Sequence, residues 1–235
     1  MVAVIGDIHG CFFTLTELVK QIRNKYSNLL IYSVGDLVDR GNFSFEVLEF
    51  VKMENINFTP GNHDYMFYFF VNEPTNNMGK AWLFNGYENT LNSYNNHFDV
   101  ISEHFNLIKK APLFYNLDDC FISHAGISKF FKRKLPSNFR EDLNLLNDFV
   151  YRRLDNEHSI LWTREKLLDL GKLQIVGHTR KIDVLFDKKN NVVYIDTSCY
   201  GGNKLSAVIV ENNNVIDILS VSTNEKDIQK LSFPH

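Results

Sequence analysis

Short polar motifs at the ends of apolar runs constrain this chain more than any other feature. Runs such as Val2-Ala3-Val4-Ile5 and residues 29–34 have the composition of buried strands. All but one of the motifs begin where such a strand should stop. The motifs are Gly6-Asp7-Ile8-His9-Gly10, Gly35-Asp36-Leu37-Val38-Asp39-Arg40-Gly41, Gly61-Asn62-His63-Asp64, His124-Ala125-Gly126, Trp162-Thr163-Arg164 and Gly177-His178-Thr179. Because ligands gather at the carboxyl ends of strands in sheets fed by helical connections, we expect these side chains to meet in one site.

Hydrophobic periodicity predicts a layered α/β fold. Strands at residues 2–6, 29–34 and 56–59 alternate with helices at 12–25 and 43–53, which predicts a βαβαβ unit with right-handed crossovers. A helical insertion is expected at about residues 65–110, and partly helical residues are expected at 128–158. The remaining pattern predicts a hairpin of residues 113–117 and 119–123, then antiparallel strands at 173–177, 182–187, 191–195, 205–210 and 215–220. We therefore expect a mixed sheet that faces a second sheet, with helices outside.

The bulk properties fit one globular domain over residues 1–235. Hydrophobic residues make up 44% of the chain, and the formal net charge of −3 argues against a broad surface for nucleic acid or anionic membranes. Cys11, Cys120 and Cys199 lack paired spacing, which fits a reducing compartment. No stretch approaches the roughly 18 apolar residues that span a bilayer, and the first strand leaves no room for a signal peptide. We therefore expect a cytoplasmic protein, whose oligomeric state the sequence leaves open.

Two carboxylates and an imidazole form the centre of the expected site. Asp7 and His9 are two residues apart, so their side chains point the same way from an extended or turning backbone. Asp36 would add a second carboxylate beside Asp7, and two carboxylates in a partly buried place repel unless a cation lies between them. The alternative is a polar turn that simply ends a strand. The pattern therefore favours one half of a metal site.

Further oxygen and nitrogen donors come from three other loops. Asn62, His124 and His178 complete a set of three oxygen-bearing side chains and three imidazoles, without a thiolate. Such a set suits Mn²⁺, Fe²⁺ or Fe³⁺, or Zn²⁺. Six donors are too many for one ion that keeps an open position, but they suit two ions roughly 3.5–4 Å apart that share one carboxylate. This geometry is used for phosphate ester hydrolysis.

Four more residues have side chains that suit the handling of a phosphate. Arg40 and Arg164 carry guanidinium groups that can grip phosphate oxygens in a fork, although surface ion pairing is the usual role of a lone arginine. His63 follows Asn62 directly, so its neighbour fixes its place. A carboxylate such as Asp39 could hold one ring nitrogen of His63 and leave the other to protonate a leaving oxygen.

In this order and spacing, these residues resemble the phosphoprotein phosphatase family of calcineurin-like metallophosphoesterases. The match runs from about residue 2 to residue 210, and a chance co-occurrence of five such blocks is implausible. Within the family, the chain is similar to the lambda-type serine/threonine phosphatases of bacteria and phages. That similarity rests on Trp82-Leu83-Phe84-Asn85-Gly86, Ile160-Leu161-Trp162-Thr163-Arg164-Glu165, and Tyr194-Ile195-Asp196-Thr197-Ser198 followed by Gly201-Gly202-Asn203.

The resemblance implies a four-layer αββα sandwich, a dimetal hydrolase and a role for each site residue. The implied metal ligands are Asp7, His9 and Asp36 for the first ion, and Asp36, Asn62, His124 and His178 for the second. The implied phosphate ligands are Arg40, Arg164 and Asn62, and His63 would be the general acid supported by Asp39. A hydroxide bridging two divalent ions, for which Mn²⁺ is expected, would attack phosphorus in line.

Two departures from the family pattern leave the substrate open. Pro60 and Asp64 flank the Gly61-Asn62-His63 block where protein phosphatases usually carry Arg and Glu, and this form is similar to the symmetrical bis(5′-nucleosyl)-tetraphosphatases. Those enzymes usually have Ala at the position of Asp39. The first hypothesis is a phosphatase for phosphoserine and phosphothreonine, or for small phosphate esters. The alternative is a diadenosine tetraphosphate hydrolase. A scaffold without turnover is the third interpretation, which no missing ligand supports.

Overall fold

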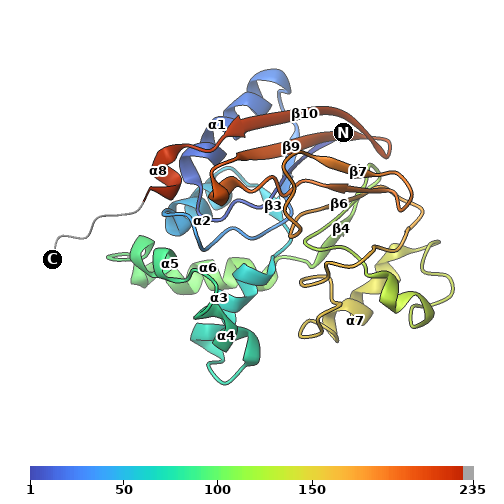
Figure 1. The fold of residues 1–235 in the computed structure, drawn as a ribbon, viewed down its shortest axis with the longest axis horizontal. Coiled ribbons are helices and arrows are strands. Elements are labelled where there is room, and N and C mark those ends of the chain that lie inside the picture. Colours follow the sequence, from blue (N-terminus) through green and yellow to red (C-terminus); the bar gives the residue numbers. More distant parts are fainter. Residues whose placement is uncertain (230–235) are drawn as a thin grey trace.

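Two five-stranded mixed sheets form the centre of the molecule in a computed structural model, which describes residues 1–229 (Figure 1). The first sheet contains, in spatial order, β10 (Asn214–Ser222), β9 (Lys204–Glu211), β1 (Val2–Ile5), β2 (Leu30–Ser33) and β3 (Asn57–Phe58). The second contains β4 (Phe114–Asn116), β5 (Phe121–Ser123), β6 (Gln174–Val176), β8 (Val192–Tyr194) and β7 (Leu185–Asp187). The expected pair of mixed sheets flanked by helices is therefore confirmed.

Alternation along the strands explains how the sheets pack together. Val4 of β1 and Tyr32 of β2 belong to one buried cluster, which also holds Ile122, Ile175 and Val208 from β5, β6 and β9. This cluster fills the space between the two sheets. The intervening residues of β1 and β2 point the other way and join a second cluster with the helices. Successive side chains on a strand face opposite sides of the sheet. β1 and β2 therefore contribute both to the cluster between the sheets and to the cluster under the helices.

The predicted βαβαβ unit is confirmed with small shifts at the ends. Helix α1 (Phe12–Lys25) has the predicted bounds, and α2 (Ser44–Met53) begins one residue later than expected. β1 is parallel to β2, and β2 is parallel to β3. The parallel pairing brings the carboxyl ends of all three strands to one edge of the sheet, which is where the first three motifs begin.

The insertion contains more helix than its composition suggested. Helix α3 (Asn62–Asn72) starts three residues before the expected Tyr65, so Asn62 and His63 occupy its first turn. The polar, Asn-rich residues 72–96 contain α4 (Asn77–Trp82) and α5 (Glu88–Ser93). A short 3₁₀ helix, η1 (Phe98–Val100), then leads into α6 (Ile101–Lys110). Buried Met78, Trp82 and Thr90 anchor these short helices, which explains why average polarity concealed them.

The prediction of antiparallel strands throughout the last third was wrong for β6. This strand is parallel to both β5 and β8, while β7 pairs with β8 in a hairpin at the sheet edge. β9 and β10 are antiparallel, but they extend the first sheet through β1. A short turn fixes only the pairing of the two strands that it joins, so strand alternation could not assign the other neighbours.

Short helices complete the remaining connections. They are η2 (Lys129–Arg133), η3 (Leu143–Leu145), α7 (Leu146–Tyr151), η4 (Cys199–Gly201) and α8 (Glu225–Ile228). No helix among residues 1–229 has both the length and the apolar character needed to traverse a bilayer. The single-domain organisation over residues 1–235 stays a prediction, and its last six residues lie outside the described part of the chain.

Helix α8 attaches the end of the described chain to the start of α1. The buried carboxylate of Asp227 accepts hydrogen bonds from the backbone N–H groups of Phe13 and Thr14, at 3.0 and 2.9 Å, and from the Thr14 hydroxyl at 2.6 Å. The N-terminal N–H groups of a helix lack partners within the helix, and a carboxylate satisfies them well. Asp227 therefore caps α1 from a distant part of the sequence.

We expect the substitution Asp227→Asn to lower the free energy of unfolding by about 1–3 kcal/mol, because it leaves buried donors at the start of α1 without a carboxylate. Urea unfolding followed by circular dichroism measures this change. The matched control is Glu225→Gln, which removes an exposed carboxylate from the same helix. Equal midpoints for the two variants would show that the Asp227 cap contributes nothing to stability.

Candidate active site

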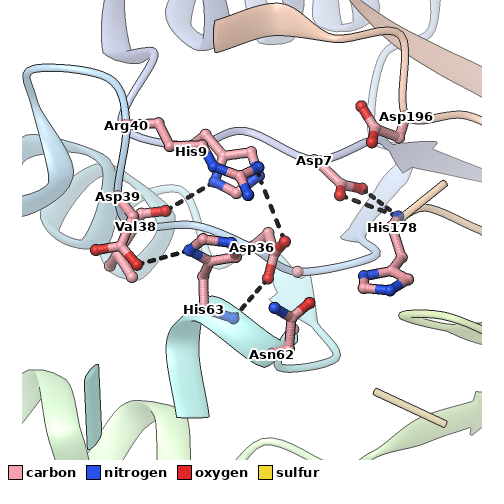
Figure 2. A network of polar contacts seen from close by, with 12 residues as sticks. Asp7, His9, Asp36, Val38, Asp39, Arg40, Asn62, His63, His178 and Asp196 are labelled. Atoms are coloured by element: carbon pink, nitrogen blue, oxygen red, sulfur yellow. Dashed lines mark hydrogen bonds and ion pairs between the residues drawn. The ribbon is translucent and has the colours of Figure 1, made fainter. Parts of the chain in front are cut away.

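Five of the six motifs lie where strands from both sheets end, and Figure 2 shows residues from four of them. Asp7 and His9 follow β1, Asp36 follows β2, and Asn62 lies in the first turn of α3 after β3. His124 and His178 follow β5 and β6 of the second sheet. Many of these residues have positive φ, including His9, Asp36 and His178, at 48°, 50° and 61°. Such a backbone is strained for residues other than glycine, and strain of this kind gathers at functional sites.

Asp36 lies at the centre of the site. Its Oδ1 accepts the backbone N–H of His63 at 2.9 Å, so the N-terminus of α3 points toward this carboxylate. Its Oδ2 is 3.4 Å from Nε2 of His9 and 3.6 Å from Nε2 of His124. A Cβ on Gly61 would lie 2.0 Å from Oδ1, so only glycine permits the close approach of this loop.

Two groups of buried side chains could each hold a metal ion, and Asp36 belongs to both. The first group is Asp36, His9 and His63, and the second is Asp36, His124 and His178. The amide oxygen of Asn62 is 3.0 Å from Nε2 of His124, which places Asn62 beside the second group. The predicted convergence of His9, Asp36, Asn62, His124 and His178 is therefore what the structure contains.

Hydrogen bonds to backbone carbonyls orient the imidazoles. Nδ1 of His9 lies 2.9 Å from the carbonyl oxygen of Val38, and Nδ1 of His124 lies 2.9 Å from that of Val34. Since a carbonyl only accepts, Nδ1 carries the proton in both rings, and Nε2 keeps a lone pair that faces Asp36. His178 has the opposite arrangement, because its Nε2 donates to the carbonyl of Trp162 at 3.1 Å. Each ring therefore presents one unprotonated nitrogen to the site.

Burial sets the charges around these groups. It lowers the pKa of His9, His124 and His178, so these rings are neutral at pH 7 and suited to bind a cation. Burial raises the pKa of Asp7, and the nearby carboxylates of Asp196 and Asp36 raise it further. Crowded buried carboxylates and neutral imidazoles form an environment that a divalent cation would stabilise, so the donor set fits the expected pair of ions.

Asp7 lies in the same cavity but outside both groups. Its two carboxylate oxygens accept the backbone N–H of His178, at 3.0 and 3.2 Å, so the side chain turns toward the second group (Figure 2). A Cβ on Gly177 would approach Asp7 to 1.8 Å, which explains the glycine there. Asp7 belongs to neither group of potential ligands, so the half-site of Asp7 and His9 stays a prediction.

His63, which belongs to the first group, forms a buried pair with Asp39. Nδ1 of His63 is 2.7 Å from a carboxylate oxygen of Asp39, as the sequence predicted. The Trp82 indole N–H donates to both oxygens of Asp39, at 2.9 and 3.0 Å, and the Thr90 hydroxyl donates at 2.7 Å. Burial raises the pKa of Asp39, while these hydrogen bonds oppose the rise. Three hydrogen bonds from Trp82 and Thr90, both in the helical insertion, therefore hold the carboxylate at Nδ1 of His63.

The two predicted phosphate ligands occupy different places. One guanidinium nitrogen of Arg40 lies 2.9 Å from Nε2 of His9, and its guanidinium carbon lies 4.4 Å from the centre of the Tyr200 ring. Arg40 thus points into the metal groups and stacks on an aromatic face. Arg164 is exposed on the loop that follows Trp162, and it lines two surface cavities. The structure therefore places one arginine inside the site and the other at its mouth.

Asp64 has a structural role that the sequence did not reveal. Its carboxylate accepts the backbone N–H groups of Gly61 at 2.8 Å, Leu37 at 2.8 Å and Val38 at 3.3 Å. It thereby joins the loop after β2 to the start of α3. Burial and the charge of Asp36 raise the pKa of Asp64 to about 8. The residue that suggested a tetraphosphatase is thus occupied with backbone groups.

Sequence reasoning did not assign roles to Asp196, Tyr200 and Thr90. Asp196 follows the end of β8, as Asp7 and Asp36 follow β1 and β2, so its position after a strand could have identified it. Burial raises the pKa of Asp196 to about 6. The Tyr200 ring lies edge-on to His9, with 4.8 Å between centroids. No local pattern pointed to Tyr200 or Thr90, because each reaches the site only through tertiary packing.

Comparisons with known proteins identify the family of the chain. The model of the calcineurin-like phosphoesterase family matches residues 1–220. An asymmetrical bis(5′-nucleosyl)-tetraphosphatase of Anoxybacillus flavithermus is 27% identical over 225 residues, which cover 87% of this chain and 88% of that protein. Serine/threonine-protein phosphatase 1 of Salmonella typhimurium is 26% identical over 221 residues, with 88% and 91% covered.

A solved structure supports the fold. The cold-active protein-tyrosine phosphatase of a psychrophilic Shewanella species superposes with a TM-score of 0.61 at 20% identity, over 95% of this chain and 80% of that one. This likeness concerns the fold alone, whereas the family match covers most of the chain. The chain therefore belongs to the calcineurin-like phosphoesterase family of hydrolases.

Proposed function

We propose that this metallophosphoesterase is a two-metal phosphomonoesterase that hydrolyses phosphoserine and phosphothreonine in proteins or peptides. The His63–Asp39 pair carries the proposal. A serine or threonine alkoxide is a poor leaving group that needs a proton, whereas a nucleotide leaves as a stable phosphate anion and needs one much less. A buried carboxylate that orients an imidazole beside the metal groups suits the first kind of leaving group.

The ligand set supports two divalent ions, for which we propose Mn²⁺, with Fe or Zn as the alternatives. Asp36 belongs to both groups and would be shared between the ions. We propose Asp7 and His9 as the further ligands of one ion, and Asn62, His124 and His178 as those of the other, which leaves His63 of the first group for the acid role. When bound, such ions supply electrophilic activation of phosphate and a nucleophile derived from water. The carbonyl contacts of the imidazoles support this assignment, because they leave a lone pair on each ring for an ion.

The proposed roles of the other residues follow from their positions. Arg40 and Arg164, with the amide of Asn62, would bind phosphate oxygens, since guanidinium groups match phosphate in geometry and charge. His63 would donate its proton from Nε2, because Nδ1 is held by Asp39.

Three buried free cysteines support the expected cytoplasmic setting.

Hydrolysis of dinucleoside polyphosphates is the second candidate. The similarity to the tetraphosphatase of A. flavithermus favours it. The Asp64 argument for it is weaker than the sequence suggested, because the Asp64 carboxylate bonds to three backbone N–H groups. A metal-loaded assay that offers a phosphoserine peptide and diadenosine tetraphosphate side by side separates the two functions. Faster release of nucleotide than of peptide phosphate would select the second.

Metal binding tests the role of Asp36. We expect about two Mn²⁺ ions per chain in the wild-type protein and at most weak binding in Asp36→Asn, because this carboxylate belongs to both groups. Equilibrium dialysis with elemental analysis measures the stoichiometry. The control Asp118→Asn removes an exposed carboxylate and should keep both ions. Full binding by Asp36→Asn would contradict the shared-ligand assignment.

Substrates with different leaving groups test His63 as the general acid. The substitution His63→Asn should lower kcat for a phosphoserine peptide by roughly 10²–10⁴-fold, the usual contribution of general acid catalysis. The loss for p-nitrophenyl phosphate should be much smaller, because p-nitrophenolate leaves without a proton. Steady-state kinetics on both substrates gives the comparison, with His97→Asn, an exposed histidine outside the site, as the control. Equal losses on both substrates would remove His63 from the acid role.

A further inference from the structure

A basic cavity opens next to the second metal group. It has a volume of about 500 Å³, and its lining includes Arg164, His178, Arg180, Lys181 and Ser198. His178 belongs to the second group, and Arg164 is a proposed ligand of the scissile phosphate. The cavity therefore begins where the reacting phosphate would lie and extends away from it. Arg180 and Lys181 have no part in the proposed chemistry.

The positive charges of this cavity form no close ion pair in the described chain, and the buried carboxylate of Asp196 attracts Arg180 only from a longer distance. Among residues 1–229, no carboxylate lies within 4.0 Å of the charged nitrogens of Arg164, Arg180 or Lys181. The nearby Asp183 pairs with Lys204 instead, and the carboxylate of Asp196 accepts the backbone N–H of Ser198. The cavity therefore holds three cations that are available to an incoming anion.

An aromatic ring connects this cavity to the metal groups. The guanidinium carbon of Arg180 lies 5.8 Å from the centre of the Tyr200 ring, and that of Arg40 lies 4.4 Å from the same centre. Cation–π contacts of this kind hold a guanidinium without consuming its hydrogen-bond donors. Arg40 and Arg180 therefore both lie near one ring, and Arg40 also contacts Nε2 of His9. The Tyr200 ring thus links the metal groups to the basic cavity.

The cavity on the other side of Arg164 has the opposite character. It has a volume of about 540 Å³, and its lining includes Asp155, Glu157 and Glu165 beside apolar Met78 and Trp162. A second negative group on the substrate would be repelled there and attracted to the basic cavity. Charge patterns of this kind select and orient ligands more than they add affinity.

We propose that the basic cavity of Arg164, Arg180 and Lys181 is a second anion-binding subsite, which takes a further oxyanion of the substrate beyond the phosphate that is cleaved. That oxyanion is a carboxylate beside the phosphorylated residue or the adjoining phosphoryl group of a phosphate chain. The inference rests on the proposed function, because it needs the scissile phosphate between Arg164 and the metal groups. It adds that substrates with two negative groups are preferred over substrates with one.

Two matched substrate pairs test the preference and identify its source. The first pair is a phosphoserine peptide with Glu on both sides of the phosphoserine and the same peptide with Gln. The second pair is adenosine diphosphate and adenosine monophosphate. We expect the wild-type protein with Mn²⁺ to favour the doubly charged member of at least one pair by roughly two- to fivefold in kcat/KM, the range of partly exposed ion pairs. A preference in the peptide pair identifies the second oxyanion as a carboxylate, and a preference in the nucleotide pair identifies it as a phosphoryl group.

The double substitution Arg180→Ala/Lys181→Ala should abolish this preference and reduce p-nitrophenyl phosphate turnover much less. The control Lys188→Ala/Lys189→Ala removes two exposed positive charges from the β7–β8 turn and should keep the preference. Equal preference in the two double variants, or none in the wild-type protein, would overturn the subsite.

A binding measurement separates the subsite from the proposed function. Protein freed of metal on a chelating resin is titrated calorimetrically with pyrophosphate and with orthophosphate. Tighter binding of pyrophosphate that is lost in Arg180→Ala/Lys181→Ala supports the subsite even if no substrate is turned over, in which case the phosphatase proposal fails alone. Equal binding of both anions by the wild-type protein, together with normal turnover, would leave the phosphatase proposal standing and overturn the subsite.

Discussion

Repulsion among buried carboxylates is the constraint on which the rest of this structure depends. Asp7, Asp36 and Asp196 lie at the ends of three strands from two different sheets, and all three are buried. Carboxylates that close together cannot all stay ionised without donors or a cation between them. Backbone donors stabilise two of these carboxylates. The N-terminus of α3 donates to Asp36, and the backbone N–H of His178 donates to Asp7. The negative charge that these donors do not compensate favours the binding of divalent cations.

The helical insertion contributes to the same site in an indirect way. Trp82 on α4 and Thr90 on α5 do not face the metal groups, yet both donate hydrogen bonds to Asp39, which in turn holds His63. A donor that is fixed by packing keeps a carboxylate oriented better than a mobile one, so the short helices support the proposed acid from outside. This link also explains why α4 and α5 form in a polar stretch, since each buries the side chain that reaches Asp39.

The sequence predicted the fold class and the meeting of the motif side chains, but not every strand pairing. Motifs at strand ends identified His9, Asp36, Asn62, His124 and His178, because parallel strands bring their carboxyl ends to a common edge. The family was also predicted correctly from the same blocks. The parallel pairing of β6 was missed, since neighbours in a sheet are chosen by long-range packing. Tyr200 and Thr90 were missed for the same reason, because their contacts join segments far apart in the chain.

The position of β9 has a consequence for how the chain folds. Paired residues of β1 and its antiparallel neighbour β9 are separated by more than 200 residues of the chain. Until β9 pairs with β1, one edge of β1 has no partner, and the loop that carries Asp7 and His9 lacks support on that side. Pairings between such distant segments slow folding and expose strand edges in the meantime. The geometry of this loop therefore depends on one of the longest-range contacts in the fold.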